Sequence, residues 1–121
     1  MTDRAAILAI DTNRRNLELL TEQLDNAGYR TRAAVSLEEL DRELGGASPI
    51  GLVLIDLTGF DERIWERCER LRHADVPFVV LTARRSPTIQ REGIRYGAST
   101  IAVKPLRVPD LLEFIRTLVE T

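Results

Sequence analysis

The chain has 121 residues, a length typical of one domain that buries a core without disulfides or a structural metal. Apolar residues make up 44% and charged residues 30% of the sequence, which excludes a disordered chain, and no apolar run is long enough to cross a bilayer. The net charge of −2 gives no basic field for nucleic acid, and the single cysteine excludes an intrachain disulfide and is typical of a reducing compartment.

In the first half of the chain, two short apolar runs are each followed by a segment of helical periodicity. A strand is predicted over residues 7–10, and leucines at helical spacing predict a helix that ends near Gly28. A second short strand is predicted over residues 30–35. Ser36 and Glu39 then form the pattern of a capping box, which predicts the start of the second helix.

The second half of the chain continues this alternation. Strands are predicted over residues 51–55, 77–81 and 100–103, and helical spacing of apolar residues follows each of them. Ser86, with a proline after it, is typical of a helix start, and Gly97 is typical of the end of the same helix. The last helix is predicted to turn these apolar residues inward: Leu111, Leu112, Ile115, Leu118 and Val119.

This order of elements predicts the fold class. Continuous apolar strands that alternate with amphipathic helices are typical of a parallel sheet with helices on both faces. Because crossovers between parallel strands are right-handed, few topologies remain. We therefore expect an α/β fold with a doubly wound, five-stranded parallel sheet in the strand order 2-1-3-4-5.

Residues with polar chemistry end four of the predicted strands, although the strand bodies are apolar. They are Asp11, Asp56, Thr82 and Lys104. Ligands of such sheets bind at the carboxyl ends of the strands, so we expect these side chains to converge on one edge. Lys104 is the only lysine among 17 basic residues, which favours a role for a compact ammonium group there.

The chemistry of these four side chains is complementary. Two nearby carboxylates repel unless a cation or a proton lies between them, and hard oxygen ligands suit Mg²⁺. A carboxylate can attack a phosphoryl group to give an acyl phosphate, whose charged oxygens need cations and hydrogen-bond donors around them. The alternative interpretation is that the acids are ordinary strand-end or helix-cap residues and that the lysine lies on the surface.

Segments in a fixed order carry a resemblance to a known family. The chain resembles the receiver domain of two-component response regulators from residue 7 to residue 119. The resemblance implies a (βα)5 flavodoxin-like fold in a single domain that covers residues 1–121. The matching segments are Ile7–Asp11, Leu52–Asp56, Pro77–Ala83, Gly97–Ala98 and Val103–Pro105.

The resemblance implies a role for each residue of the expected site. Asp56 matches the phosphoacceptor, and Asp11 matches the outer acidic residue near Mg²⁺. Asp56 and the backbone carbonyl of Thr58 match further metal ligands. Thr82 matches the hydroxyl residue that follows the phosphoryl group, and Lys104 matches the lysine that contacts the phosphate.

One departure from the family pattern concerns the metal site. The family usually has a second acidic residue at the end of the first strand, where this chain has Thr12. A hydroxyl in place of a carboxylate removes one charge, so we expect Mg²⁺ to bind weakly and phosphorylation to be slow. Asp61 or Glu62 could supply the missing carboxylate, but solvated acids near a helix start are the favoured interpretation.

Further departures concern the loop beside Asp56 and the response to phosphorylation. Phe60 stands where the family usually has a proline, and Ile64 stands where it has a glycine. Ile101 replaces the aromatic residue whose rotamer usually switches. Trp65 is interpreted as a packing residue, as is the single cysteine.

The resemblance implies a cytoplasmic signalling domain that accepts a phosphoryl group on Asp56 from a histidine kinase or a phosphotransfer protein. The charge change would shift a conformational equilibrium at the face formed by the fourth helix, the fifth strand and the fifth helix. This face would contact a downstream protein or an attached output domain. A dimer through the last two helices is compatible with this arrangement. We expect no direct contact with nucleic acid or membrane, and no enzymatic activity beyond the domain's own phosphorylation and dephosphorylation.

Two alternatives stay open. A pseudo-receiver keeps the fold but binds a partner without phosphorylation; the departures above favour it, whereas Asp56, Thr82 and Lys104 disfavour it. A haloacid-dehalogenase-like phosphatase also uses an aspartate at the end of its first strand. It needs a second aspartate two residues later, where this chain has Asn13.

Overall fold

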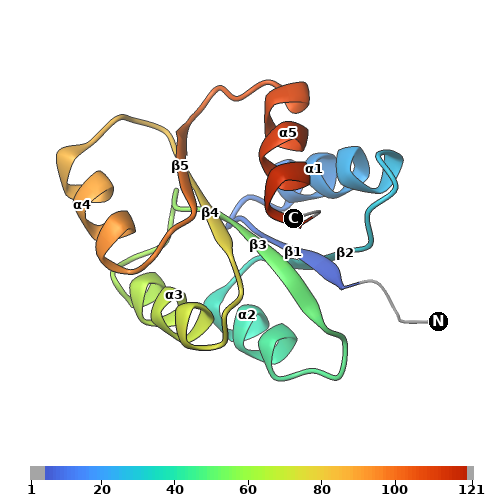
Figure 1. The fold of residues 1–121 in the computed structure, drawn as a ribbon, viewed down its shortest axis with the longest axis horizontal. Helices are drawn as coiled ribbons and strands as arrows, with labels where there is room; N and C mark the ends of the chain where they lie inside the picture. Colours follow the sequence, from blue (N-terminus) through green and yellow to red (C-terminus); the bar gives the residue numbers. More distant parts are fainter. Residues whose placement is uncertain (1–4, 120–121) are drawn as a thin grey trace.

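The computed structural model describes residues 5–119, which form one parallel sheet with helices on both faces (Figure 1). The strands are β1 (Ala6–Ile10), β2 (Thr31–Ala34), β3 (Ile50–Asp56), β4 (Phe78–Thr82) and β5 (Thr100–Val103). The helices are α1 (Arg14–Asn26), α2 (Leu37–Leu44), α3 (Arg63–His73), α4 (Pro87–Arg95) and α5 (Val108–Val119). The strand order is β2-β1-β3-β4-β5, which confirms the predicted topology.

The strands supply two separate hydrophobic cores, one on each face of the sheet. Successive side chains of a strand point to opposite faces, so the central strands need apolar residues at every position. In β1, Leu8 packs in the core beneath α2 and α3, and Ile7 packs in the core beneath α1 and α5. Figure 1 shows α1 and α5 on one face of the sheet and α2, α3 and α4 on the other.

The predicted helix starts are formed by side-chain hydrogen bonds. The Ser36 hydroxyl accepts a hydrogen bond from the Glu39 amide at 3.2 Å, and the Glu39 carboxylate accepts one from the Val35 amide at 3.0 Å. The Ser86 hydroxyl accepts a hydrogen bond from the Ile89 amide at 3.4 Å. These contacts satisfy amides that have no partner within the helix, and they confirm both predicted caps.

Four of the five strands differ from their predicted ranges by one residue at one or both ends. β2 is one residue shorter at each end than predicted, because it is an edge strand that pairs only with β1, from Thr31 to Ala34. β3 starts earlier and includes Asp56, because its pairing with β4 continues to Asp56 opposite Leu81. Asp56 is therefore held by the sheet itself and does not lie in the following loop.

The last turn of α5 also differs from the prediction. Leu111 and Ile115 are buried, but the Val119 residue is 42% exposed. Val119 borders a cavity of about 330 Å³ at the amino-terminal edge of the sheet, beside Ile7 and Leu52. The last described turn of the helix therefore lacks a fully packed surface beneath it.

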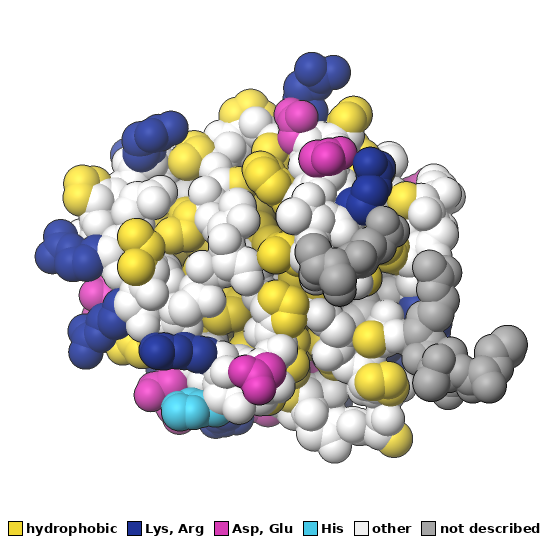
Figure 2. All heavy atoms as spheres, viewed as in Figure 1, with side chains coloured by type: hydrophobic (Ala, Val, Ile, Leu, Met, Phe, Trp, Pro, Cys, Tyr) yellow, Lys and Arg dark blue, Asp and Glu magenta, His cyan; other side chains and the backbone are white. Residues whose placement is uncertain are grey.

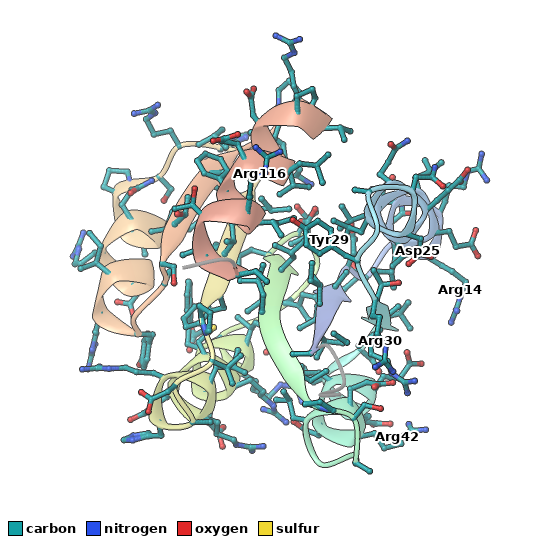
Figure 3. The ribbon with its side chains drawn as sticks, turned by 45° about the vertical axis from the view of Figure 1, so that its right-hand side comes forward. Arg14, Asp25, Tyr29, Arg30, Arg42 and Arg116 are labelled. Atoms are coloured by element: carbon teal, nitrogen blue, oxygen red, sulfur yellow. The ribbon has the colours of Figure 1, made fainter. Side chains whose placement is uncertain are left out.

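Charged side chains of the helices project outward from the fold. Figure 3 shows Arg14 and Arg42 projecting away from α1 and α2, and both residues are exposed. No helix within residues 5–119 is both long enough and apolar enough to cross a membrane.

Helix α4 packs on β5 through a close contact between Gly93 and Ile101. A Cβ atom added at Gly93 would collide with the Cδ1 atom of Ile101, so the glycine allows the isoleucine to lie directly against the helix backbone. Ile101 is partly buried and packs against the core beneath α2 and α3. The aliphatic residue at this position therefore anchors α4 to the sheet.

We expect Ile101→Ala to lower the free energy of unfolding by about 2 kcal/mol, because it removes the contact with Gly93 and leaves a void under α4. Urea unfolding measures the effect. The matched control is Ile94→Ala on α4, where the isoleucine is 73% exposed and the expected change is within about 0.5 kcal/mol. Equal effects of the two substitutions would contradict the anchoring role of Ile101.

Candidate functional site

The buried polar residues of the described chain gather at the carboxyl edge of the sheet. Asp11, Asp56 and Thr82 are 5%, 4% and 4% exposed, and they are the buried polar or charged residues among those described. Asp11 follows β1, Asp56 ends β3 and Thr82 ends β4, so adjacent strands place them side by side. Such burial is costly unless each group has a partner.

Asp56 is bonded at both of its carboxylate oxygens. The Lys104 ammonium donates to Asp56 Oδ2 at 2.6 Å, and the Thr58 amide donates to Asp56 Oδ1 at 3.0 Å. The Lys104 side chain is 32% exposed, whereas the Asp56 side chain is 6% exposed. The lysine thus brings a flexible cation from solvent onto a buried carboxylate, as expected from the convergence of the strand ends.

Lys104 is positioned by its backbone as well as by this ion pair. Its amide donates to the Thr82 carbonyl at 2.8 Å, and the peptide bond between Lys104 and Pro105 is cis. Thr82 itself points elsewhere: its hydroxyl donates to the Arg84 carbonyl at 3.2 Å. The structure therefore brings Lys104 onto Asp56 but directs the Thr82 hydroxyl into its own loop.

Asp11 is a buried acid close to a second acid. Burial raises the pKa of the Asp11 carboxyl above its ordinary value of 3.8, a hydrogen bond from the Asn13 amide lowers it, and the negative charge of Asp56 raises it further. The Asn13 amide donates to Asp11 Oδ1 at 2.8 Å. Burial is the main cause of the raised pKa, and the neighbouring carboxylate of Asp56 adds to it, so an ionised Asp11 is electrostatically costly at this site.

The loop after β3 is tied to the end of β1 by a contact that sequence reasoning missed. The Thr12 hydroxyl donates to the Thr58 carbonyl at 2.9 Å. Gly59 follows with a φ of +88°, and a Cβ atom there would collide with the Thr12 side chain. The only sequence signal for this contact is the glycine after Thr58, because just a glycine fits both the backbone angle and the space.

The oxygen atoms at this edge fit a hard divalent cation. The carboxylates of Asp11 and Asp56 and the carbonyl of Thr58 would be its ligands, and its charge would offset the burial and the Asp56 charge that raise the pKa of Asp11. The Thr58 carbonyl already accepts a hydrogen bond from Thr12. Within residues 5–119, no group of three or more acidic, histidine or cysteine side chains is arranged to bind a metal.

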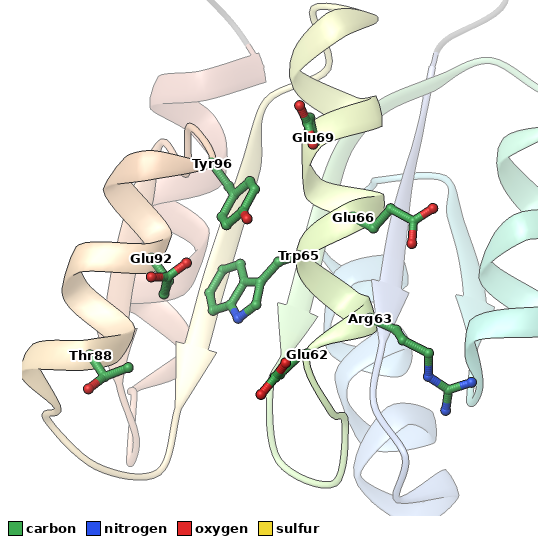
Figure 4. Close-up of a pocket in the computed structure, with 8 residues that line it drawn as sticks. All are labelled: Glu62, Arg63, Trp65, Glu66, Glu69, Thr88, Glu92 and Tyr96. Atoms are coloured by element: carbon green, nitrogen blue, oxygen red, sulfur yellow. The ribbon is translucent and has the colours of Figure 1, made fainter.

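Neither Asp61 nor Glu62 forms a hydrogen bond or ion pair with a residue of the candidate site among the described residues. The Arg63 guanidinium pairs with Asp61 at 2.9 Å and holds the pKa of that carboxyl below its usual value. Glu62 lies at the space between α3 and α4, where Figure 4 shows its side chain. Both residues are exposed, in agreement with the favoured interpretation of solvated acids near a helix start.

The interpretation of Cys68 and Trp65 as packing residues is confirmed. Cys68 is fully buried, and burial raises the pKa of its thiol to about 12, so the thiol is unreactive at neutral pH. Trp65 is partly buried and packs against the core beneath α2 and α3, and its ring also lines a cavity between α3 and α4.

Comparisons with known proteins agree with one another. The model of the response regulator receiver domain matches residues 7–116. The chain is 33% identical over 118 residues to the response regulator MprA of Mycobacterium leprae, covering 93% of this chain and 50% of that protein. It is 34% identical over 113 residues to the transcriptional regulatory protein HprR of Escherichia coli, covering 91% of this chain and 49% of that protein. The chain thus spans about half the length of these relatives.

A solved structure supports the same fold. The CheY-like response regulator receiver domain protein of Methanospirillum hungatei superposes with a TM-score of 0.87 at 22% identity, covering 98% of this chain and 95% of that chain. At this level of identity the likeness bears on the fold alone.

We expect Asp11→Asn to raise the free energy of unfolding by about 1 kcal/mol at neutral pH without divalent ions, because it removes a buried charge beside Asp56. A carboxyl whose pKa is raised by folding costs stability once it ionises. The advantage of the variant should therefore be small near pH 4 and should grow as the pH rises through the folded-state pKa of Asp11.

Urea unfolding of both proteins across this pH range, with chelator present, measures the difference. The asparagine keeps an oxygen that accepts from the Asn13 amide, so the comparison isolates the charge. A variant that is less stable than the wild-type protein at pH 7 would show that Asp11 is not under electrostatic strain.

Proposed function

The chain belongs to the response regulator receiver domain family, and on that premise we propose that it accepts a phosphoryl group on Asp56 in an Mg²⁺-dependent reaction. The observation that carries the proposal is the ion pair between Lys104 and Asp56 at the carboxyl edge of the sheet. A buried carboxylate with a partly exposed cation at one oxygen has the groups that a phosphoryl acceptor needs.

In the proposed reaction, an oxygen of the Asp56 carboxylate attacks the phosphorus atom of the donor. A bond forms between that oxygen and phosphorus, and the bond from phosphorus to the donor breaks, with its electron pair leaving on a histidine nitrogen or on acetate. Asp56 becomes an acyl phosphate. A bound Mg²⁺ would neutralise charge on the phosphoryl oxygens, held by Asp11, Asp56 and the Thr58 carbonyl.

The side chains of Lys104 and Thr82 would then reorient toward the phosphoryl group. The Lys104 ammonium, which now contacts Asp56 Oδ2, would move to a phosphoryl oxygen and keep its ionic partner. The Thr82 hydroxyl would leave the Arg84 carbonyl and donate to the phosphoryl group. The movement of Thr82 would release the loop after β4, which leads directly into α4.

The proposed output surface is the face formed by α4, β5 and α5. Figure 2 shows hydrophobic side chains in the middle of this view, in the region between α4 and α5. Ile94 on α4 and Val108 on α5 are exposed, at 73% and 37%. We propose that this face contacts a downstream protein, an output domain or a second receiver, and that the phosphoryl donor is a histidine kinase or a phosphotransfer protein.

The direct test uses intact mass spectrometry after incubation with Mg²⁺ and acetyl phosphate. We expect a single phosphoryl adduct on the wild-type protein and none on Asp56→Asn, because the amide is not a nucleophile. Absence of an adduct at high Mg²⁺ would contradict the proposal and would favour a pseudo-receiver that binds its partner without phosphorylation.

Weak metal binding is a second part of the proposal. The Thr12 hydroxyl stands where a carboxylate would be a ligand, and it bonds to the Thr58 carbonyl that would coordinate the ion. We expect Thr12→Asp to strengthen Mg²⁺ binding by about tenfold in calorimetric titration. Thr12→Val is the matched control, because it removes the hydroxyl without adding charge. Equal affinities of the wild-type protein and Thr12→Asp would contradict this assignment.

A further inference from the structure

A groove lies between α3 and α4, apart from the phosphoryl site. It encloses a cavity of about 660 Å³, and its walls come from the start and middle of α3 and from the length of α4. Figure 4 shows Trp65 extending from α3 toward α4, with Tyr96 and Glu92 facing it from the other side. None of the residues that line the cavity belongs to the candidate phosphoryl site.

The groove is built around a pair of stacked aromatic rings. The centroids of Trp65 and Tyr96 are 5.7 Å apart, and their planes differ by 15°. Both residues are only partly buried, so part of their surface stays open to a ligand. The guanidinium of Arg95 lies 5.4 Å from the centroid of the Tyr96 ring. The aromatic pair therefore already attracts one planar cation through its π-electrons.

Two of the carboxylates that line the groove have no cationic partner among residues 5–119. Glu62 and Glu92 line it, and neither forms an ion pair or a side-chain hydrogen bond with another of residues 5–119. Glu92 is half-buried, which makes an unpaired charge more costly.

Three arginines near the groove already have partners among the described residues. Arg63 pairs with Asp61 at 2.9 Å, and Arg67 pairs with Asp41 of α2 at 2.9 Å. Arg95 stacks on Tyr96. A third glutamate of the groove, Glu66, lies 3.6 Å from Arg70. The groove is therefore aromatic and negative, and the described residues leave two of its carboxylates without a counter-charge.

We propose that this groove binds a basic segment of a partner protein, with an arginine guanidinium stacked on Trp65 and paired with Glu62 and Glu92. Arginine suits it better than lysine, because the planar guanidinium stacks on aromatic rings and binds carboxylates through two parallel hydrogen bonds. Nucleic acids and anionic membranes are disfavoured by the negative charge of the groove. The proposal does not depend on phosphorylation of Asp56.

The single tryptophan of the chain reports directly on this groove, because it is Trp65. The probe is a peptide with an acetylated amino terminus and an amidated carboxyl terminus, in which three arginines are separated by alanines. The control peptide has the same sequence with citrulline in place of each arginine. Citrulline keeps the shape of the side chain but lacks its charge. We expect the arginine peptide to change the Trp65 emission in a saturable way at 0.15 M salt, and the citrulline peptide to have no such effect.

Charge variants locate the binding site. We expect Glu92→Gln and Glu62→Gln each to weaken binding by about tenfold, the value of one charge-assisted contact. The matched control is Glu22→Gln, an exposed glutamate of α1 on the other face of the sheet, which should leave the affinity unchanged.

Several results would overturn the proposal. One is the absence of saturable binding up to about 1 mM peptide. Another is equal weakening by Glu22→Gln, which would mean that the peptide follows only the overall charge. Equal binding of the citrulline peptide would remove the role of the cation. Self-association of the protein that Glu92→Gln abolishes would assign the groove to a second copy of this chain instead of a separate partner.

Discussion

The ion pair between Lys104 and Asp56 is the contact on which the proposed chemistry of this protein depends. It joins the ends of β3 and β5, which are separated by β4, and it places a cation at 2.6 Å from a carboxylate that the sheet buries. A buried carboxylate without such a partner would be destabilising. The ammonium reaches Asp56 from a partly exposed position, so the partner can move without unpacking the core. The same pair thus stabilises the buried carboxylate, and in the proposed reaction it would also respond to the new charge of the phosphoryl group.

The fold could be predicted from the sequence because its signals are local and repeated. Apolar runs of strand length, helical spacing and residues such as Ser36 and Gly97 each act over a few positions, and all of them agree on one topology. The side chains that would meet at the carboxyl edge followed from that topology, since adjacent parallel strands end at the same edge. The strand ends differ from the predicted ones by one residue, because they depend on pairing with a neighbouring strand, as Asp56 pairs with Leu81.

The details that sequence reasoning missed all depend on contacts between distant parts of the chain. Thr12 bonds to the carbonyl of Thr58, 46 positions away, and no residue near Thr12 in the sequence predicts this contact. The orientation of Thr82 toward the Arg84 carbonyl is a rotamer choice that composition does not determine. Trp65 has the helical position of a packing residue, and only the placement of α4 beside α3 shows that its ring lines a groove.

Helix α4 connects the proposed activities of the domain. Its approach to the sheet depends on the contact between Gly93 and Ile101, its outer surface exposes Ile94, and its inner side carries Glu92 toward the groove. The loop before it contains the Arg84 carbonyl that now holds the Thr82 hydroxyl. If phosphorylation of Asp56 moves Thr82, the change passes along the loop that joins β4 to α4. It would then alter the position of α4, and with it the exposed surface of the helix and the groove.

The most direct test of this account observes the Lys104 ammonium itself. Because the chain has one lysine, isotope-labelled lysine gives a single side-chain signal in NMR spectra. The account predicts that this signal differs between the wild-type protein and Asp56→Asn, and that acetyl phosphate with Mg²⁺ shifts it in the wild-type protein only. A Lys104 signal that is the same in both proteins and unaffected by the phosphodonor would contradict the central role of the ion pair.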